Sequence, residues 1–391
     1  MRKLQRRMPC KKIQTRNNNI HQQHTRKIMS KNTIIKTSFA WLSFLVGFDA
    51  TSQVKENKTQ VSTIISTEGE YNFRNHKGNI ACLLNVSIES PVFDGFSLQS
   101  NLLAAQNLCL TQGKDFSIAQ NKQGFSNILL DQSLPLALFQ FGINKTFGNS
   151  FSAFLGLRNM NCDYFTSDYT SLFTGSSYGM YPTIADNWSV GNYPASAFGL
   201  HLEWNLTDNL TLKNSLYNGK ASVDWDKVFC FHPKSDGLIN ISQISYKVNE
   251  QDRSLLGEYH LGFVCANTTQ ETVIATKQAN YSVFTLVQQP LYNGNYSLGL
   301  LLQAGFSIKR ISNTYAYYSV GVIAKDIIKP NFCTAVSVNH ALYTYDGNET
   351  DVELTFFLPI TQTLSLQTAL HCITTNAKTN TVGILRLNFE L

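Results

Sequence analysis

The last eleven residues of the chain, TVGILRLNFEL, constrain its fold more than any other segment, because they alternate strictly between two faces of an extended strand. One face is apolar and the other polar, with Gly383, Leu385, Leu387, Phe389 and Leu391 opposite Arg386, Asn388 and Glu390. In a soluble protein the apolar face of such a strand packs on a core. In an outer-membrane barrel the apolar face meets lipid and the polar face meets water. The strand alone leaves both folds open.

The positive charge of the chain is concentrated near its beginning. Residues 1–36 contain eleven Lys or Arg and no Asp or Glu, and a short apolar run from Phe39 to Phe48 follows, bounded by Asp49 and small residues. This order is typical of a signal peptide, whose apolar run is too short to span a bilayer. We therefore predict a basic leader and signal peptide over residues 1–52, with Met29 as a possible true start. The alternative is a buried N-terminal segment.

The rest of the chain is acidic and unusually poor in charge. Residues 53–391 hold 21 Lys plus Arg against 25 Asp plus Glu, so no nucleic-acid partner is expected. Charged residues make up 15% of the whole chain, which also contains 25 Phe and 17 Tyr; about 25% charged residues is usual. A composition that is polar without being charged suits a barrel with a wet interior and a lipid-facing exterior better than it suits a cytosolic enzyme.

Alternating segments recur along the chain. Residues 200–206 and 210–212 flank the turn Thr207–Asn209 and predict a hairpin, and residues 352–358 and 364–370 flank a second turn. Further strands are expected to start near residues 80, 97, 136, 150, 239, 254, 280, 296, 314 and 333. These give about fifteen strands with the terminal one. Single-chain bacterial barrels have an even number, so one strand is expected to be missing from this set.

The largest break in the alternation runs from Asn159 to Ala197 and is rich in Tyr, Phe and Trp. Long loops in compact proteins are usually functional or disordered, and this one is too aromatic for disorder. We predict a loop that narrows a pore or contacts a ligand.

The sequence offers little for catalysis or metal binding. The segment GSSYG, Gly175–Gly179, fits a nucleophile-elbow pattern, but that pattern carries meaning only between a strand and a helix of an α/β sheet. Seven cysteines follow the leader without a close pair, which favours small apolar residues on strands over disulfides or a zinc site. No enzyme activity and no cofactor are expected.

Six segments, in order, resemble the OprB-type carbohydrate-selective porins of bacterial outer membranes. They are QGFSNI (123–128), the stretch from Gly156 to Thr183, the stretch from Ser196 to Gly219, QQPLY (288–292), residues 351–373, and VGILRLNFEL (382–391). The chain departs from the family pattern at residues 138–140 and 329–333, where the family carries charged residues. The resemblance spans roughly residues 70–391.

The resemblance implies a water-filled barrel in the bacterial outer membrane, through which carbohydrates and small ions diffuse passively. A sugar ring lies well on aromatic side chains, and its hydroxyl groups need weak donors and acceptors. The aromatic candidates are Tyr169, Tyr181 and Trp188. The alternative for these rings is an interfacial girdle or packing within the loop. The polar candidates for the pore lining are Arg158, Asp163, His201, Glu203, Glu353, Gln367 and Arg386. Their alternative is a set of ion pairs that brace the wall.

We thus predict an all-β protein, a transmembrane antiparallel β-barrel of about 16 strands with short periplasmic turns and longer extracellular loops. Residues 53–79 are expected to form a periplasmic N-terminal segment or plug, and residues 80–391 the barrel. The expected partners are mono- or oligosaccharides in transit and outer-membrane lipid, with a homotrimer possible. The alternative function is a non-conducting barrel that serves as a binding or adhesion scaffold, plugged by the long loop or by residues 53–80.

Overall fold

The computed structural model describes residues 58–109, 123–128, 134–191, 193–249, 255–268, 278–309, 312–375 and 378–391. The predicted leader, residues 1–52, lies outside these ranges. The part from residue 54 onward forms one compact unit, and the description that follows concerns this unit alone. Among the residues that the structure describes, no helix is both long and apolar enough to cross a membrane.

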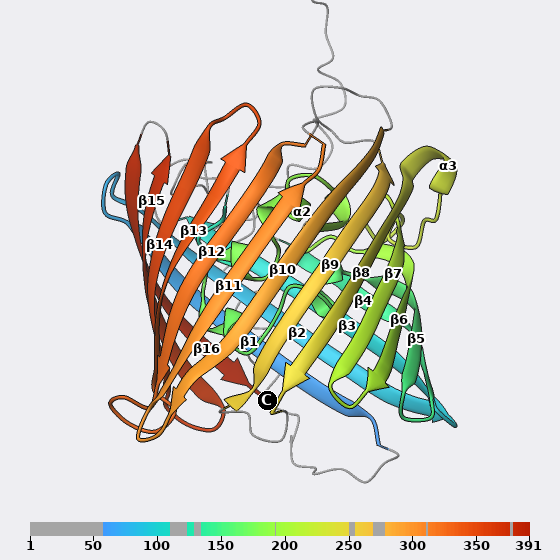
Figure 1. Ribbon diagram of the computed structural model, residues 1–391, viewed down its shortest axis with the longest axis horizontal. Helices are drawn as coiled ribbons and strands as arrows, with labels where there is room; N and C mark the ends of the chain where they lie inside the picture. Colours follow the sequence, from blue (N-terminus) through green and yellow to red (C-terminus); the bar gives the residue numbers. More distant parts are fainter. Residues whose placement is uncertain are drawn as a thin grey trace, which may run out of the picture. The chain divides into compact units, whose positions relative to one another are not determined.

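Sixteen antiparallel strands, each paired with its neighbours in sequence, form a closed barrel (Figure 1). The strands are β1 (Gln60–Asn72), β2 (Lys77–Phe93), β3 (Phe96–Cys109), β4 (Leu134–Phe147), β5 (Phe151–Arg158), β6 (Ala197–Thr207), β7 (Leu210–Asn218), β8 (Gly237–Val248), β9 (Gly257–Thr268), β10 (Gln278–Asn293), β11 (Ser297–Ser307), β12 (Thr314–Lys325), β13 (Cys333–Tyr343), β14 (Asn348–Pro359), β15 (Leu364–Thr375) and β16 (Thr379–Glu390). The predicted fold class is confirmed, as are the two predicted hairpins, β6–β7 and β14–β15.

The strand missing from the sequence prediction is β1. It pairs with β2 on one side and with β16 on the other, from Ile64 opposite Glu390 to Asn72 opposite Val382, and so closes the barrel. The prediction that residues 53–79 form a periplasmic segment or plug is therefore wrong for Gln60–Asn72 and for the start of β2. The alternation in QVSTIISTEGEYN is weak, because Ser and Thr occupy both faces.

The barrel reverses the usual arrangement of polar and apolar residues. Large apolar side chains on the outside are exposed, as Leu385 shows at 54%, whereas Arg386 beside it is only 5% exposed and faces the interior. In β13, Val336 and Val338 are exposed while Ser337 and Asn339 are buried. This pattern is typical of barrels that meet lipid outside and water or protein inside. It confirms the predicted sidedness of the terminal strand.

The two ends of the barrel differ in their connections. Turns such as residues 148–150 and 208–209 lie at the end that also holds both barrel termini, which is the periplasmic end in barrels of this kind. The three longest connections, residues 110–133, 159–196 and 219–236, lie at the other end.

Short helical turns occur in the second and third of these long connections. They are η1 (Met160–Cys162), η2 (Thr170–Leu172), η3 (Ser176–Tyr178), α2 (Pro182–Ala185), η4 (Ser189–Gly191) and α3 (Pro233–Asp236).

Candidate functional site

Residues 159–196, which we call the inner loop, fold into the barrel and pack on its inner wall. The loop begins where β5 ends, after only eight strand residues. The hydroxyl group of Tyr164 is 2.8 Å from that of Ser215 on β7, and the hydroxyl group of Tyr181 donates to the carbonyl oxygen of Thr285 on β10 at 2.9 Å. The loop therefore reaches across the interior from the β7 side to β10 and beyond. The loop that the sequence predicted to narrow a pore or to contact a ligand thus lies inside the barrel.

The aromatic rings of the inner loop form its packing core. Tyr181 and Trp188 are 0% and 3% exposed and belong to one buried cluster with Phe165, Phe284 and Tyr317. A second cluster contains Tyr169 together with Phe173 and Tyr178, whose rings stack at 4.2 Å. Burial raises the pKa values of the Tyr178 and Tyr181 phenols well above the usual range. The side chains of Tyr178 and Tyr181 are therefore neutral and belong to a packed core.

The prediction that Tyr169, Tyr181 and Trp188 offer ring faces to a sugar is therefore wrong. These side chains are already covered by protein, as the alternative interpretation, packing within the loop, expects. Inward-facing glycines of the wall make the close packing possible. A Cβ atom on Gly299 would clash with the Tyr169 ring, and one on Gly305 would clash with Thr183. These two glycines on the inner face of β11 are the feature of the sequence that could have indicated this close packing.

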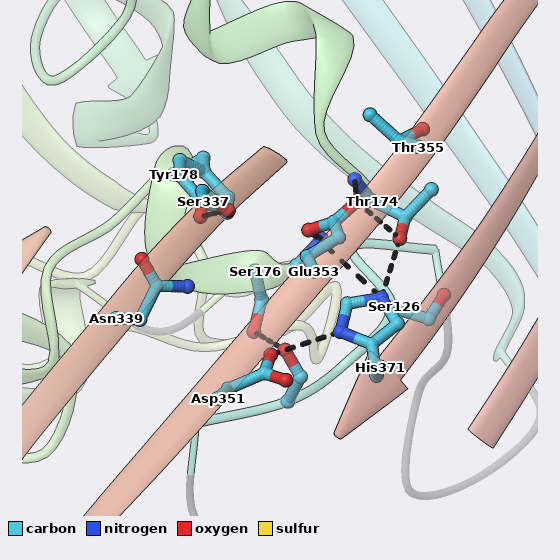
Figure 2. Close-up of polar contacts among 12 residues, drawn as sticks. Ser126, Thr174, Ser176, Tyr178, Ser337, Asn339, Asp351, Glu353, Thr355 and His371 are labelled. Atoms are coloured by element: carbon cyan, nitrogen blue, oxygen red, sulfur yellow. Dashed lines mark hydrogen bonds and ion pairs between the residues drawn. The ribbon is translucent and has the colours of Figure 1, made fainter. Parts of the chain in front are cut away.

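One buried carboxylate on β14 holds the middle of the inner loop to the wall. Glu353 accepts hydrogen bonds from the backbone N–H of Thr174 at 2.7 Å and of Gly175 at 3.2 Å, and from the Thr174 hydroxyl group at 3.0 Å (Figure 2). Thr174 and Glu353 are both 0% exposed. Charge-assisted bonds of this kind are stronger than those between neutral groups. Glu353 therefore anchors the loop and is not open to a passing solute.

His371 on β15 extends this anchor. Its Nε2 atom is 2.8 Å from the Thr174 hydroxyl group and its Nδ1 atom is 2.9 Å from Asp351 (Figure 2). Asp351 accepts, and the Thr174 proton is directed to Glu353, so both ring nitrogens act as donors. The order Thr174, His371, Asp351 has the connectivity of a catalytic triad, but Thr174 and His371 are both 0% exposed. A substrate could not reach the hydroxyl group in this arrangement.

A second segment, residues 123–128, also lies on the inner wall and contacts the inner loop. Gln123 donates its backbone N–H to Glu349 on β14 at 2.9 Å, and Ser176 donates its backbone N–H to Gly124 at 2.9 Å. The ring of Phe125 lies 6.3 Å from that of His371. The sequence placed QGFSNI before a strand pair and gave no sign that it would sit inside the barrel.

Two more of the predicted pore-lining residues also serve the wall and its loop. Gln367 donates to the carbonyl oxygen of Leu172 at 2.9 Å, so it fixes the inner loop to β15. Arg386 pairs with Glu68 at 2.6 Å across the seam between β16 and β1. The predicted lining role of Glu353, Gln367 and Arg386 is replaced by contacts within the wall and the loop, as the bracing alternative expects.

Three other predicted residues, Arg158, Asp163 and His201, meet at the base of the inner loop. The Arg158 guanidinium donates to both carboxylate oxygens of Asp163, at 2.7 and 2.5 Å, and packs over the ring of Phe154. His201 places its Nε2 atom 3.4 Å from Asp163 and its Nδ1 atom 2.7 Å from the Ser215 hydroxyl group. The sequence identified these residues as inward-facing without showing that they touch.

A cavity of about 380 Å³, which we call the charged cavity, lies beside this cluster toward the short-turn end. Two cross-strand ion pairs line it, Glu203 with Lys213 at 3.4 Å and Glu258 with Lys247 at 3.3 Å. Acidic side chains of the inner loop complete the lining, among them Asp163 and Asp168. Glu203, one of the predicted pore-lining residues, lines this cavity. Lys213, Lys247 and Glu258 were not among the predicted pore-lining residues, although each occupies an inward position of a strand.

A second cavity of about 390 Å³, the amide cavity, lies on the opposite side of the same loop base. Its polar lining comes mainly from side-chain amide and hydroxyl groups, including Gln99, Asn101 and Gln140, with Arg158 and Glu89 as the charged members. Gln99 accepts from Gln140 at 2.9 Å and from Arg158 at 3.3 Å. The lining offers donors and acceptors from strands β1 to β5.

Cys162 lines both cavities and marks the point where they adjoin. Its side chain is exposed to these interior spaces. Desolvation raises the pKa of the thiol to about 11, with a further contribution from Asp163 and opposition from Arg158. All six cysteines whose side chains the structure describes are free thiols.

Comparison with known proteins places these features in context. The family model described as carbohydrate-selective porin, OprB family, matches residues 94–390. A search of curated proteins finds no match. The fold is similar to that of OprB from Pseudomonas putida in a high-pH structure, with a TM-score of 0.70, 14% identity, and coverage of 85% of this chain and 94% of that one.

Two other solved structures are similar at lower scores. The low-pH structure of the same P. putida protein gives a TM-score of 0.56 and 13% identity, with coverage of 85% and 93%. An anion-selective porin from Comamonas acidovorans gives 0.55 and 11%, with coverage of 86% and 100%. At such identities these likenesses concern the barrel fold alone.

Proposed function

Because the chain belongs to the OprB family of carbohydrate-selective porins, we propose that the amide cavity and the charged cavity are the parts of its pore that contact the solute. The protein is a porin of the bacterial outer membrane that lets carbohydrates diffuse passively. Family and fold are those of a channel rather than of an enzyme. The proposal concerns which residues meet the sugar.

The observation that carries the proposal is the polar lining of the two cavities at the base of the inner loop. Each volume lies within the range of about 300–1,000 Å³ that is usual for small-molecule sites. A neutral sugar has many hydroxyl groups and no charge, so it suits the amide cavity, whose side chains both donate and accept. Individual hydrogen bonds to amide groups are modest in free energy, which favours exchange over retention.

The charged cavity suits a different task. Its paired acidic and basic groups face one another across neighbouring strands and create a strong local field. Such a field orders water and opposes the entry of apolar solutes. We assign Arg158, Asp163 and Glu203 to the pore lining, together with Gln99, Asn101, Gln140, Lys213, Lys247 and Glu258. His201 positions Asp163.

Sugar block of ion conductance in planar bilayers tests the proposal. The double variant Gln99→Ala with Asn101→Ala is expected to conduct ions but to need a higher glucose concentration for the same block. Leu98→Ala, which alters the lipid-facing side of the same strand, is the matched control. If the double variant and the parent show the same concentration dependence, the amide cavity is not where the sugar binds.

Two further assignments extend the proposal to the whole chain. We propose that residues 1–52 are removed on export, because their basic and apolar pattern is that of a signal peptide. N-terminal sequencing of protein purified from outer membranes tests this. Lipid contact follows the exposed apolar belt of the barrel. A homotrimer stays a prediction, which the migration of unheated protein on a gel checks.

A further inference from the structure

The barrel wall has a notch above β5. The β4–β5 ladder runs only from Phe141 opposite Leu157 to Phe147 opposite Phe151. The upper half of β4, Leu134–Gln140, therefore has no strand partner on that side among the residues that the structure describes. An open strand edge at membrane depth is costly, because its backbone groups need partners that lipid cannot supply.

Residues 222–231, part of the β7–β8 connection, close this notch, and we call them the clasp. The clasp begins with a bridge between Ser222 and Ser196. The indole N–H of Trp225 donates to the carbonyl oxygen of Leu136 on the open β4 edge at 3.2 Å. The Ser196 hydroxyl group donates to the carbonyl oxygen of Phe139 on the same edge at 2.7 Å. Side chains thus supply hydrogen bonds that a neighbouring strand would normally supply.

The clasp passes from the inner to the outer side of the wall. Val223 packs with Ala105 and Ala137, which face the interior. Val228 is 2% exposed and packs with Leu138 and Leu157. Leu157 has the same orientation as the lipid-facing Leu155, yet it is 0% exposed against 54% for Leu155. The clasp covers an apolar part of the outer barrel surface.

Ring contacts confirm that the second half of the clasp lies outside. Phe229 packs edge-to-face on Phe141, and Phe231 packs in the same way on Phe198. Phe141 is itself 40% exposed on the outer surface. The covered area is thus continuous with the lipid-facing belt.

In the exposed part of the clasp, aromatic rings lie beside charged side chains, and several backbone N–H groups are hydrogen-bonded within the segment. Trp225, Phe229 and Phe231 are 53%, 45% and 46% exposed. The backbone N–H groups of Lys227 and Val228 donate to Asp224, and that of Cys230 donates to Lys227, so the segment forms a compact turn. Amphipathic aromatic rings beside charges are typical of the boundary between lipid acyl chains and headgroups.

We propose that the clasp is a lipid-contacting piece of the wall, with Trp225, Phe229 and Phe231 seated at the headgroup boundary of the outer leaflet. The partner is membrane lipid at that boundary, and the clasp closes the barrel wall laterally where β5 is too short to do so. The inference rests on the outer-membrane location and is independent of which residues bind sugar.

Fluorescence quenching of Trp225 in vesicles tests the proposal. The Trp225 signal is the difference between the parent and Trp225→Phe, measured in lipids brominated near the headgroup, in lipids brominated near the chain ends, and in unbrominated lipids with aqueous iodide. We expect most of this signal to be lost with shallow bromines and retained with iodide. Trp204→Phe, which reports a lipid-facing residue on β6 with 51% exposure, is the control.

Two outcomes overturn the proposal. Loss of the Trp225 signal with iodide alone places the clasp in water. Protection from every quencher, together with crosslinks between chains, places a second copy on it. As a separate check, Val228→Asn, which removes the apolar contact with Leu138 and Leu157, should release the clasp, so that trypsin cuts after Lys227 in the folded barrel but leaves the parent uncut. Equal resistance of both proteins means that the clasp is not held by this contact.

Discussion

Replacement of Glu353 by alanine is expected to free the middle of the inner loop. Glu353 accepts three hydrogen bonds from Thr174 and Gly175, all in a fully buried setting. The variant leaves two backbone N–H groups without their acceptor, and each unsatisfied buried donor costs about 1–3 kcal/mol. We therefore expect the loop anchor to weaken by about 3 kcal/mol, even after partial relaxation.

Hydrogen exchange measures this weakening directly. A loss of about 3 kcal/mol in local opening corresponds to roughly 100-fold faster amide exchange for residues 170–180, since about 1.4 kcal/mol is a factor of ten. Single-channel recordings should show greater current noise, because a freed loop moves within the conducting interior.

Val352→Ala is the matched control, because it alters the next residue of β14 on the lipid side. Heat-modifiable migration shows whether each variant remains a barrel. Unchanged exchange over residues 170–180 in a folded Glu353→Ala barrel would refute the view that this carboxylate anchors the loop.

Further predictions concern the base of the loop and the packing beneath it. Arg158→Ala leaves the buried Asp163 without its principal partner and should lower the free energy of unfolding, measured by urea titration, by about 3–5 kcal/mol. The double variant Arg158→Met with Asp163→Asn should recover stability. An Arg158→Ala protein as stable as the parent contradicts a buried ion pair. Lys213→Gln with Lys247→Gln should shift the zero-current potential in a salt gradient toward cation selectivity, whereas Lys145→Gln, at a side chain that lies over the rings of Phe96 and Phe147 and does not line the cavity, should not. In a variant that keeps only Cys162, alkylation should be slow at neutral pH, because the thiolate is the reactive form. The rate should rise about tenfold per pH unit up to the thiol pKa of about 11. A rate that has already reached its plateau at pH 8 argues against the raised pKa. Gly305→Val should push Thr183 from the wall and alter conductance, while Gly69→Ala on β1, where the added Cβ atom meets only the Leu385 carbonyl oxygen at 4.0 Å, leaves it unchanged.

Strand β1 was not predicted because its residues differ little in polarity between the two faces. Most strands can be recognised in the sequence because Leu, Val or Phe alternate on the lipid-facing side, as Val352, Leu354 and Phe356 do on β14. In β1 Thr67 and Gly69 share the outward face with Val61 and Tyr71, and Ile64 lies on the opposite face, so the contrast between the two faces is reduced. The even-number rule for barrels showed that a strand was missing, but only the pairing with β16 identified it.

The aromatic loop shows a different limit. Its length and composition predicted a loop of functional importance, and the structure places it inside the barrel. Composition could not tell a ring that faces water from a ring that faces Gly299 or Tyr317, because burial depends on partners far away in sequence. The cavities are lined by Gln99, Asn101 and Lys213, ordinary polar residues whose importance depends on where the loop leaves space.

The barrel, its approximate strand number and the sidedness of strands such as β16 could be predicted from the sequence, since they follow from a two-residue period repeated along the chain. The same local pattern indicated that Arg158 and Glu203 face inward. The folded structure was needed to show that Glu353 and Gln367 hold a loop, that Tyr181 and Trp188 form its core, and that residues 222–231 cross the wall. Alternation specifies the face on which a side chain lies, whereas contacts between segments far apart in sequence arise only when the barrel closes and its loops fold against it.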